Sequence, residues 1–261
     1  MLKSRHFRSL RIIVLLIVLF VVVMNTWLSS VRIQSWKRPV WVVLYPINAD
    51  GQADTQMYIN ALSAEHFDDI NGFFAREGRR YHIDLNPVTE FYLAPPLTVQ
   101  PPEIDVQASL FERVFWSLNM RWWSWRNDNW SGPEPDVRIY LRYFSPRKNQ
   151  QLSHSLGLQK GMIGLVNGFA SVDYIGTNNF VIAHELMHTF GASDKYSLET
   201  NEPVFPDGYA DPQQNPLLPQ TRAEVMAGRV KVSPGWLLIP KSLDDVIVGP
   251  LTASEIGWES L

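Results

Sequence analysis

The stretch HELMHTFGASDKY, residues 184–196, contains two histidines four positions apart and a glutamate directly after the first. On a helix, residues four positions apart lie on the same face, so His184 and His188 can bind one metal ion. Glu185 lies about 100° around the helix from His184, where its carboxylate can reach a metal-bound water without binding the metal. This spacing predicts a metal site on a helix.

The residues around the motif predict that this helix is buried. It is apolar almost all round because of Phe180, Ile182, Ala183, Leu186, Met187 and Phe190. Burying two histidines and a glutamate without partners is costly, which favours a metal site over simple packing. We expect Thr177 or Asn178 to cap the helix, and Gly191 to end it with a positive φ that turns the chain back.

The motif resembles the extended pattern of the metzincin zinc peptidases, H-E-x-x-H-x-x-G-x-x-H. Four residues are in register with that pattern, namely His184, Glu185, His188 and Gly191. Asp194 stands where the third histidine usually is. The segment is most similar to the snapalysin and immune inhibitor A types, which have an aspartate at that position and a tyrosine two residues later, here Tyr196.

The resemblance implies a zinc ion with three protein ligands, namely His184, His188 and Asp194. It implies that Glu185 is the general base that acts on zinc-activated water. It also places Met226, in the segment AEVMAGR, in a methionine turn beneath the metal, although a core methionine is an alternative. Tyr196 is expected either to hydrogen-bond a ligand or the oxyanion, or to pack as an ordinary side chain.

The third ligand has alternatives among the later glutamates. The chain has no cysteine, so any metal must be held by His, Asp or Glu. Zinc peptidases of the thermolysin type take a glutamate from a later helix, and the available glutamates are Glu199, Glu202 and Glu224. The first two lie among turn-forming residues, and Glu224 closely precedes Met226, so Asp194 is favoured.

The resemblance implies an α+β domain over residues 40–261, with a mixed twisted sheet of the zincin type and the motif helix as its active-site helix. The segment from Val40 reads as a buried strand, residues 63–78 as an amphipathic helix, and residues 136–144 as a half-buried strand. Residues 157–170, with four glycines, suit an edge strand or a loop that lines a cleft.

A further helix is expected over residues 105–126. It has an apolar stripe, which is typical of a helix packed on a core, formed by Phe111, Val114, Phe115, Leu118, Trp122 and Trp125. Trp116 and Trp123 lie off this stripe. We interpret them as core residues of a broadly apolar helix, with a solvent-facing surface for a membrane or a ligand as the alternative.

The N-terminus predicts a membrane anchor. Residues 12–24, IIVLLIVLFVVVM, are unbroken apolar residues that follow a basic leader, residues 1–11. We therefore expect a transmembrane signal anchor over 12–28 and a linker over 29–39, with a cytoplasmic leader and a periplasmic or extracellular domain. A cleaved signal peptide is the alternative, but the small residues of a cleavage site are missing.

The charge distribution excludes one class of partner. Seven of the 23 basic residues, and none of the 26 acidic residues, lie in residues 1–38. Residues 39–261 therefore carry 16 basic against 26 acidic residues, a net charge of −10. Because phosphate contacts need a basic face, no nucleic-acid partner is expected.

These observations together predict a membrane-anchored, zinc-dependent endopeptidase that acts on a protein or peptide substrate outside the cytoplasm. One alternative is a catalytically silent, metal-containing binding or anchor protein, although a structural metal has no use for a base such as Glu185. Another is a zinc hydrolase of peptidoglycan cross-bridges, which the sequence does not separate from a peptidase.

Overall fold

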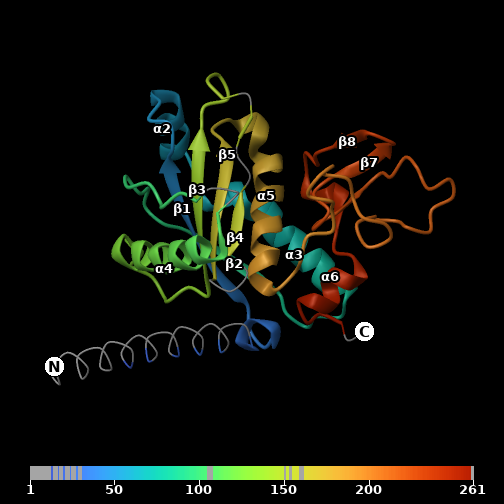
Figure 1. The fold of residues 1–261 in the computed structure, drawn as a ribbon, viewed down its shortest axis with the longest axis horizontal. Helices are drawn as coiled ribbons and strands as arrows, with labels where there is room; N and C mark the ends of the chain where they lie inside the picture. The colour runs from blue at the N-terminus through green and yellow to red at the C-terminus, as the bar shows by residue number, and fades with distance from the viewer. Residues whose placement is uncertain are drawn as a thin grey trace, which may run out of the picture.

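A computed structural model describes residues 31–104, 108–149, 151–152, 155–158 and 162–259, together with Ile13, Ile17, Phe20, Met24 and Leu28. The central element is a five-stranded sheet with helices on both faces (Figure 1). Its strands lie in the order β2-β1-β3-β5-β4. Their bounds are Val40–Asn48 for β1, Thr89–Leu93 for β2, Val137–Phe144 for β3, Leu156–Leu158 for β4 and Ile163–Phe169 for β5.

The helices connect and cover these strands. Their bounds are Ala53–Asn60 for α2, Asp68–Arg80 for α3, Leu110–Arg126 for α4, Ile175–Phe190 for α5 and Pro250–Glu255 for α6. Three short 3-10 helices cover Ala64–Phe67, Val172–Tyr174 and Leu243–Asp245. Two small sheets follow α5, one of β6 (Ala223–Glu224) with β9 (Val246–Ile247), the other of β7 (Val230–Ser233) with β8 (Trp236–Leu238).

The predicted α+β class is wrong, because the protein is α/β with a mostly parallel sheet. Strand β1 pairs in parallel with β2 and β3, and β3 pairs in parallel with β5, while β4 alone is antiparallel. The segment between β1 and β2 contains α2 and α3, so a helical crossover joins these two parallel neighbours. The segment with α4 connects β2 to β3, which lies on the other side of β1. The continuous apolar run of β1 fits this class, because central parallel strands are buried on both faces.

Successive residues of the strands contribute to two separate cores. On one face, Val42, Leu44 and Ile139 belong to the core that α3 and α5 cover. On the other face, Val43 and Tyr140 belong to the core that α4 covers. This alternation follows from the two-residue period of a strand, and it gives a helix, sheet, helix arrangement of three layers.

Helix α4 is turned by about half a circle from the orientation that its apolar stripe predicts. Its buried residues are Trp116, Met120 and Trp123, whereas all six residues of the predicted stripe are exposed. The interpretation of Trp116 and Trp123 as core residues is confirmed. The stripe does not face the core because the opposite side of the helix, also apolar, packs on Tyr140 and its neighbours.

The predicted membrane anchor over 12–28, and the extracytoplasmic location inferred from it, are wrong. Among the residues that the structure describes, no helix is long and apolar enough to cross a membrane. The unbroken apolar run of residues 12–24 has 13 residues, fewer than the ~20 that a membrane-spanning helix needs. The leader, residues 1–11, and most of 12–28 lie outside the described residues.

Part of the predicted linker, residues 29–39, packs on the domain. Ile33 and Trp36 are buried in the core that also contains α5 and α6. The indole nitrogen of Trp36 donates a hydrogen bond to the carbonyl of Ile256 (2.8 Å), and its ring lies edge-on to that of Phe190. Residues from Ile33 onward therefore contribute to the body that carries α5.

Candidate metal centre

Helix α5 lies between the sheet and the C-terminal segment, and both cover it (Figure 1). It begins at Ile175, directly after a 3-10 turn, so the predicted caps Thr177 and Asn178 lie inside the helix. The Asn178 side chain instead accepts from the backbone nitrogen of Phe169 (3.0 Å) and donates to its carbonyl (2.9 Å). These two bonds fix α5 to the end of β5.

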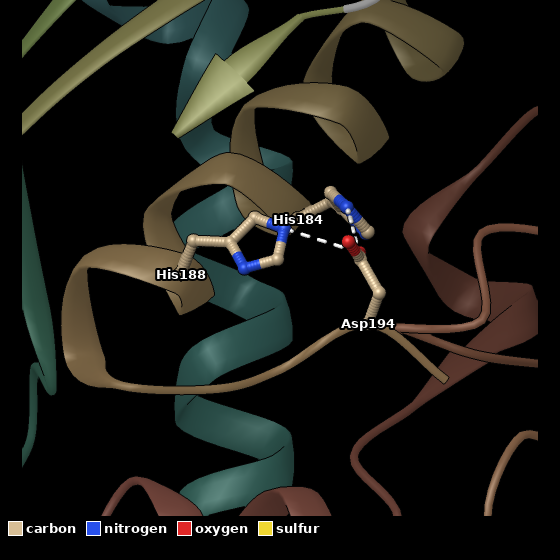
Figure 2. A group of neighbouring side chains, drawn as sticks. All are labelled: His184, His188 and Asp194. Atoms are coloured by element: carbon tan, nitrogen blue, oxygen red, sulfur yellow. Dashed lines mark ion pairs between the residues drawn. The ribbon is translucent and has the colours of Figure 1, made fainter. Parts of the chain in front are cut away.

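Two histidines of α5 and one aspartate from the following loop point toward one another (Figure 2). One carboxylate oxygen of Asp194 lies 3.3 Å from Nε2 of His184 and 3.2 Å from Nε2 of His188. One ligand atom from each of the three residues lies within 4.8 Å of the others. The predicted group is thus brought together, and it can bind a metal ion.

Backbone carbonyls hold both imidazoles in the orientation that a metal requires. Nδ1 of His184 lies 2.9 Å from the carbonyl oxygen of Val225, and Nδ1 of His188 lies 2.9 Å from that of Ala192. Because a carbonyl oxygen only accepts hydrogen bonds, each Nδ1 must carry the proton. In the neutral rings, the lone pair is then on Nε2, the atom that faces Asp194.

Two of the three separations among the ligand atoms fit a small tetrahedral ion. Metal–ligand bonds of about 2.0–2.1 Å at tetrahedral angles put neighbouring ligand atoms about 3.3 Å apart. The two nitrogen–oxygen distances, 3.2 and 3.3 Å, agree with that spacing. The chemistry of the ligands agrees as well, since two imidazoles and a carboxylate suit a divalent transition metal.

Gly191 takes the positive φ that the sequence predicts, 114°, and ends α5. The backbone nitrogen of Gly191 donates to the carbonyl of His188 (3.1 Å), and that of Ala192 donates to the carbonyl of Met187 (3.1 Å). A Cβ at Gly191 would lie 3.0 Å from Nε2 of Gln34, tighter than an ordinary contact. Glycine is needed here because it lets the chain reverse and bring Asp194 back over the helix.

The ion pairs at this centre change two pKa values in opposite directions. Burial lowers the pKa of His184, but the hydrogen bond to Asp194 and the charge of Glu185 outweigh burial and raise it to about 9. Burial raises the pKa of Asp194, but the hydrogen bonds to His184 and His188 outweigh it and lower that pKa. Without a metal, a proton on His184 therefore stabilises the cluster near neutral pH.

Glu185 and Tyr196 lie beside the three ligands. Glu185 is buried and, through its charge, contributes to the raised pKa values of His184 and Tyr196. The ring of Tyr196 is 6.5 Å from that of His184. Burial, together with the charges of Asp194 and Glu185, raises the pKa of Tyr196 to about 12, so its phenol remains a hydrogen-bond donor at neutral pH.

Met226 lies fully buried in a turn that follows β6, and this turn touches the centre. The residue before it, Val225, supplies the carbonyl that bonds His184. Two of the alternative ligands have other partners, since Glu202 pairs with Lys231 (2.8 Å) and Glu224 is buried among backbone donors. Glu199 is exposed and lies outside the group of three.

Several residues that complete the centre were not found by sequence reasoning. The carbonyls of Val225 and Ala192 carry no sequence signal, because any residue supplies one. Ser193 and Lys195 flank Asp194, and both bond the carboxylate of Glu255. A pairing over about 60 positions is not visible in one sequence.

No protein-family model matches the chain, and no curated protein matches it.

Proposed function

We propose that the protein is a zinc-dependent endopeptidase of the metzincin type, which hydrolyses peptide bonds in a protein or peptide substrate. One observation carries the proposal. Two imidazole nitrogens and a carboxylate converge on one side of a buried helix, and a glutamate directly follows the first histidine. A buried helix has no packing reason for this set of side chains.

The number of ligands favours a catalytic ion over a structural one. Structural zinc sites usually have four protein ligands, whereas catalytic sites have three and leave a position for water or substrate. Among the described residues, three ligands gather at this centre. When bound there, zinc would polarise the scissile carbonyl and lower the pKa of the attacking water.

The remaining steps belong to side chains of the chain itself. Glu185 takes the proton of the attacking water and passes it to the leaving amine. Tyr196, which stays protonated at neutral pH, donates a hydrogen bond to the oxygen that gains negative charge. Asp194 makes the centre less positive than a third histidine would.

The test separates metal binding from hydrolysis. We expect the wild type to contain stoichiometric zinc and to cleave members of a peptide library in a chelator-sensitive way. Glu185→Gln should keep the zinc but lose hydrolysis about 10²–10⁴-fold, because a general base contributes about that much. Glu199→Gln, at an exposed position outside the centre, is the matched control and should keep both properties.

Other outcomes point to the alternatives. Stoichiometric zinc without hydrolysis above the level of Glu185→Gln would support a metal-containing binding protein. Cleavage of peptidoglycan cross-bridges without cleavage of ordinary peptides would support the cell-wall hydrolase. Absence of stoichiometric zinc in the wild type would refute the proposal.

A further inference from the structure

We infer that the short helix α6 positions the metal centre through two carboxylates, namely Glu224, which bonds the beginning of the helix, and Glu255, its last residue, which bonds the loop around Asp194. This inference rests on the proposed metal site, but not on the reaction proposed for it. Neither carboxylate belongs to the motif at residues 184–196, and neither is a metal ligand. We call the pair of contacts the α6 brace.

Glu224 connects the turn after β6 to the beginning of α6. Its side chain is fully buried and accepts four hydrogen bonds. One oxygen accepts from the backbone nitrogens of Met226 (2.6 Å) and Ala227 (3.0 Å). The other accepts from the backbone nitrogen of Gly249 (3.1 Å) and the hydroxyl of Thr252 (2.7 Å). Both oxygens of this carboxylate are therefore used to join two backbone segments.

The turn that Glu224 holds contacts both parts of the metal centre. The carbonyl of Val225 bonds Nδ1 of His184, which sets the orientation and the tautomer of that ring. The carbonyl of Met226 accepts from the backbone nitrogen of Lys195 (2.9 Å), the residue after Asp194. A shift of this turn would therefore move a histidine ligand and the aspartate ligand together.

Glu255, the last residue of α6, holds the loop on both sides of Asp194. Its carboxylate accepts from the backbone nitrogen (2.9 Å) and the hydroxyl (2.6 Å) of Ser193. It also accepts from the ammonium group of Lys195 (2.7 Å), a side chain that is itself buried. The ammonium group in turn donates to the carbonyl of Ser193 (3.0 Å). The residues before and after Asp194 are thus tied to one carboxylate.

The brace matters because metal ligands tolerate little displacement. Bond lengths at a competent site lie within about 0.2 Å of their ideal values. Residues that orient metal ligands without touching the metal typically change metal affinity by about 10–100-fold when they are removed. A purely structural role for Glu224 and Glu255 would instead lower folding stability and leave the affinity and spectrum of the folded protein unchanged.

The first experiment measures Co²⁺ and Zn²⁺ affinity of the full chain by competition with a chelator, and records the visible absorption of the Co²⁺ form. We expect Glu255→Ala to bind about 10–100-fold more weakly and to shift the cobalt bands, because the Asp194 loop loses three contacts. Glu255→Gln should lose less, since its amide oxygen still accepts from Ser193. Glu259→Gln, an exposed neighbour, is the control and should match the wild type.

A second variant tests the role of Glu224 indirectly. Replacing Glu224 itself can prevent folding, because its side chain is fully buried. Thr252→Val keeps the shape of the side chain and removes one of the four donors to Glu224. It should weaken metal binding and shift the cobalt bands in the folded protein. Chemical denaturation of each metal-free variant shows that affinity is measured on folded chains.

The outcomes separate the brace from the proposed reaction. Folded Glu255→Ala and Thr252→Val proteins with wild-type affinity and wild-type cobalt bands would refute the brace. A wild type that binds metal but hydrolyses no peptide would refute the peptidase and leave the brace standing if the variants weaken binding. A wild type that binds neither ion would overturn both.

Discussion

Helices α4 and α5 are similar in length and in apolar content, but they differ in what surrounds them. α4 has 17 residues and packs on the sheet with one side only, while α5 has 16 residues and is covered by the sheet and by the C-terminal segment. Six apolar residues of α4 are exposed, and we call them the outer face of α4: Phe111, Val114, Phe115, Leu118, Trp122 and Trp125. A helical apolar stripe therefore shows which residues share a side, but not whether anything covers that side.

The polar residues of the two helices show the same contrast. On α5, His184, Glu185 and His188 are buried, and each histidine ring bonds a backbone carbonyl. Polar groups stay in such a place only when the structure provides partners, so they mark a site more reliably than apolar residues mark a core. On α4, the apolar residues alone left two opposite orientations open.

The largest change in the free energy of unfolding is expected for one of two adjacent tryptophans of α4. Trp123 is 6% exposed and Trp122 is 57% exposed. Trp123→Ala should lower the free energy of unfolding by about 3–5 kcal/mol, as for other buried aromatic residues. Trp122→Ala, the matched control, should cost about 1 kcal/mol or less, because most of its ring is already in water. Urea denaturation measures both. Equal losses would mean that α4 packs on the sheet in another orientation.

The next effect concerns α5 and the loop that follows it. Asp194→Ala removes one of the three proposed metal ligands, so zinc affinity should fall by more than the ~100-fold upper range for indirect partners. Asp207→Ala, at an exposed position of a later loop, should leave the affinity unchanged. Chelator competition measures both variants. Undiminished affinity of Asp194→Ala would show that Asp194 is not the third ligand.

A smaller effect follows from the raised pKa of His184. At pH values below its pKa of about 9, zinc must displace a proton from this ring, so affinity should rise about tenfold per pH unit between pH 7 and 9. The stability of the metal-free protein should change in the opposite direction. The pKa of His184 in the folded chain lies above the ordinary histidine value of 6.5, so its stabilisation is complete below pH 6.5 and is lost as the pH rises through 9.

The control for this pH dependence is Asp194→Asn, which removes the carboxylate that raises the pKa of His184. In this variant, the loss of metal-free stability between pH 6.5 and 9 should become smaller. Denaturation midpoints across the pH range measure it. A wild-type midpoint that falls no more steeply than that of the variant would show that the His184–Asp194 pair does not stabilise the metal-free chain.

Local signals predicted a large part of the centre. The spacing of His184 and His188 and the position of Gly191 depend only on helix geometry and on the backbone freedom of glycine, so one sequence was enough. Asp194 was favoured because it stands where the third histidine of the metzincin pattern usually is. The structure places its carboxylate beside the two histidines. The partners of these residues were not predicted, because Val225 and Glu255 reach the centre only through tertiary packing.

The fold was predicted less well, for a related reason. The bounds of β1 and β3 were close to the prediction, since apolar runs mark buried strands. The class was wrong because strand direction depends on the crossovers that join the strands, which no single segment encodes. α4 was misoriented because Trp116, Met120 and Trp123 form a second apolar side, and the choice between the sides depends on Tyr140 in β3.

The smallest effect on stability is expected on the outer face of α4. Phe111 and Phe115 are 87% and 74% exposed, so replacing both with Gln removes little buried surface and should change the free energy of unfolding by no more than about 0.5 kcal/mol. The same change should clearly reduce binding of the dye ANS, which reports exposed apolar surface. A loss of several kcal/mol would show that this side of α4 is covered, and α4 would then be enclosed as α5 is. Unchanged stability together with reduced dye binding would show that the outer face of α4 is uncovered. The two helices would then differ in what packs against them, since both sequences are apolar enough to be buried.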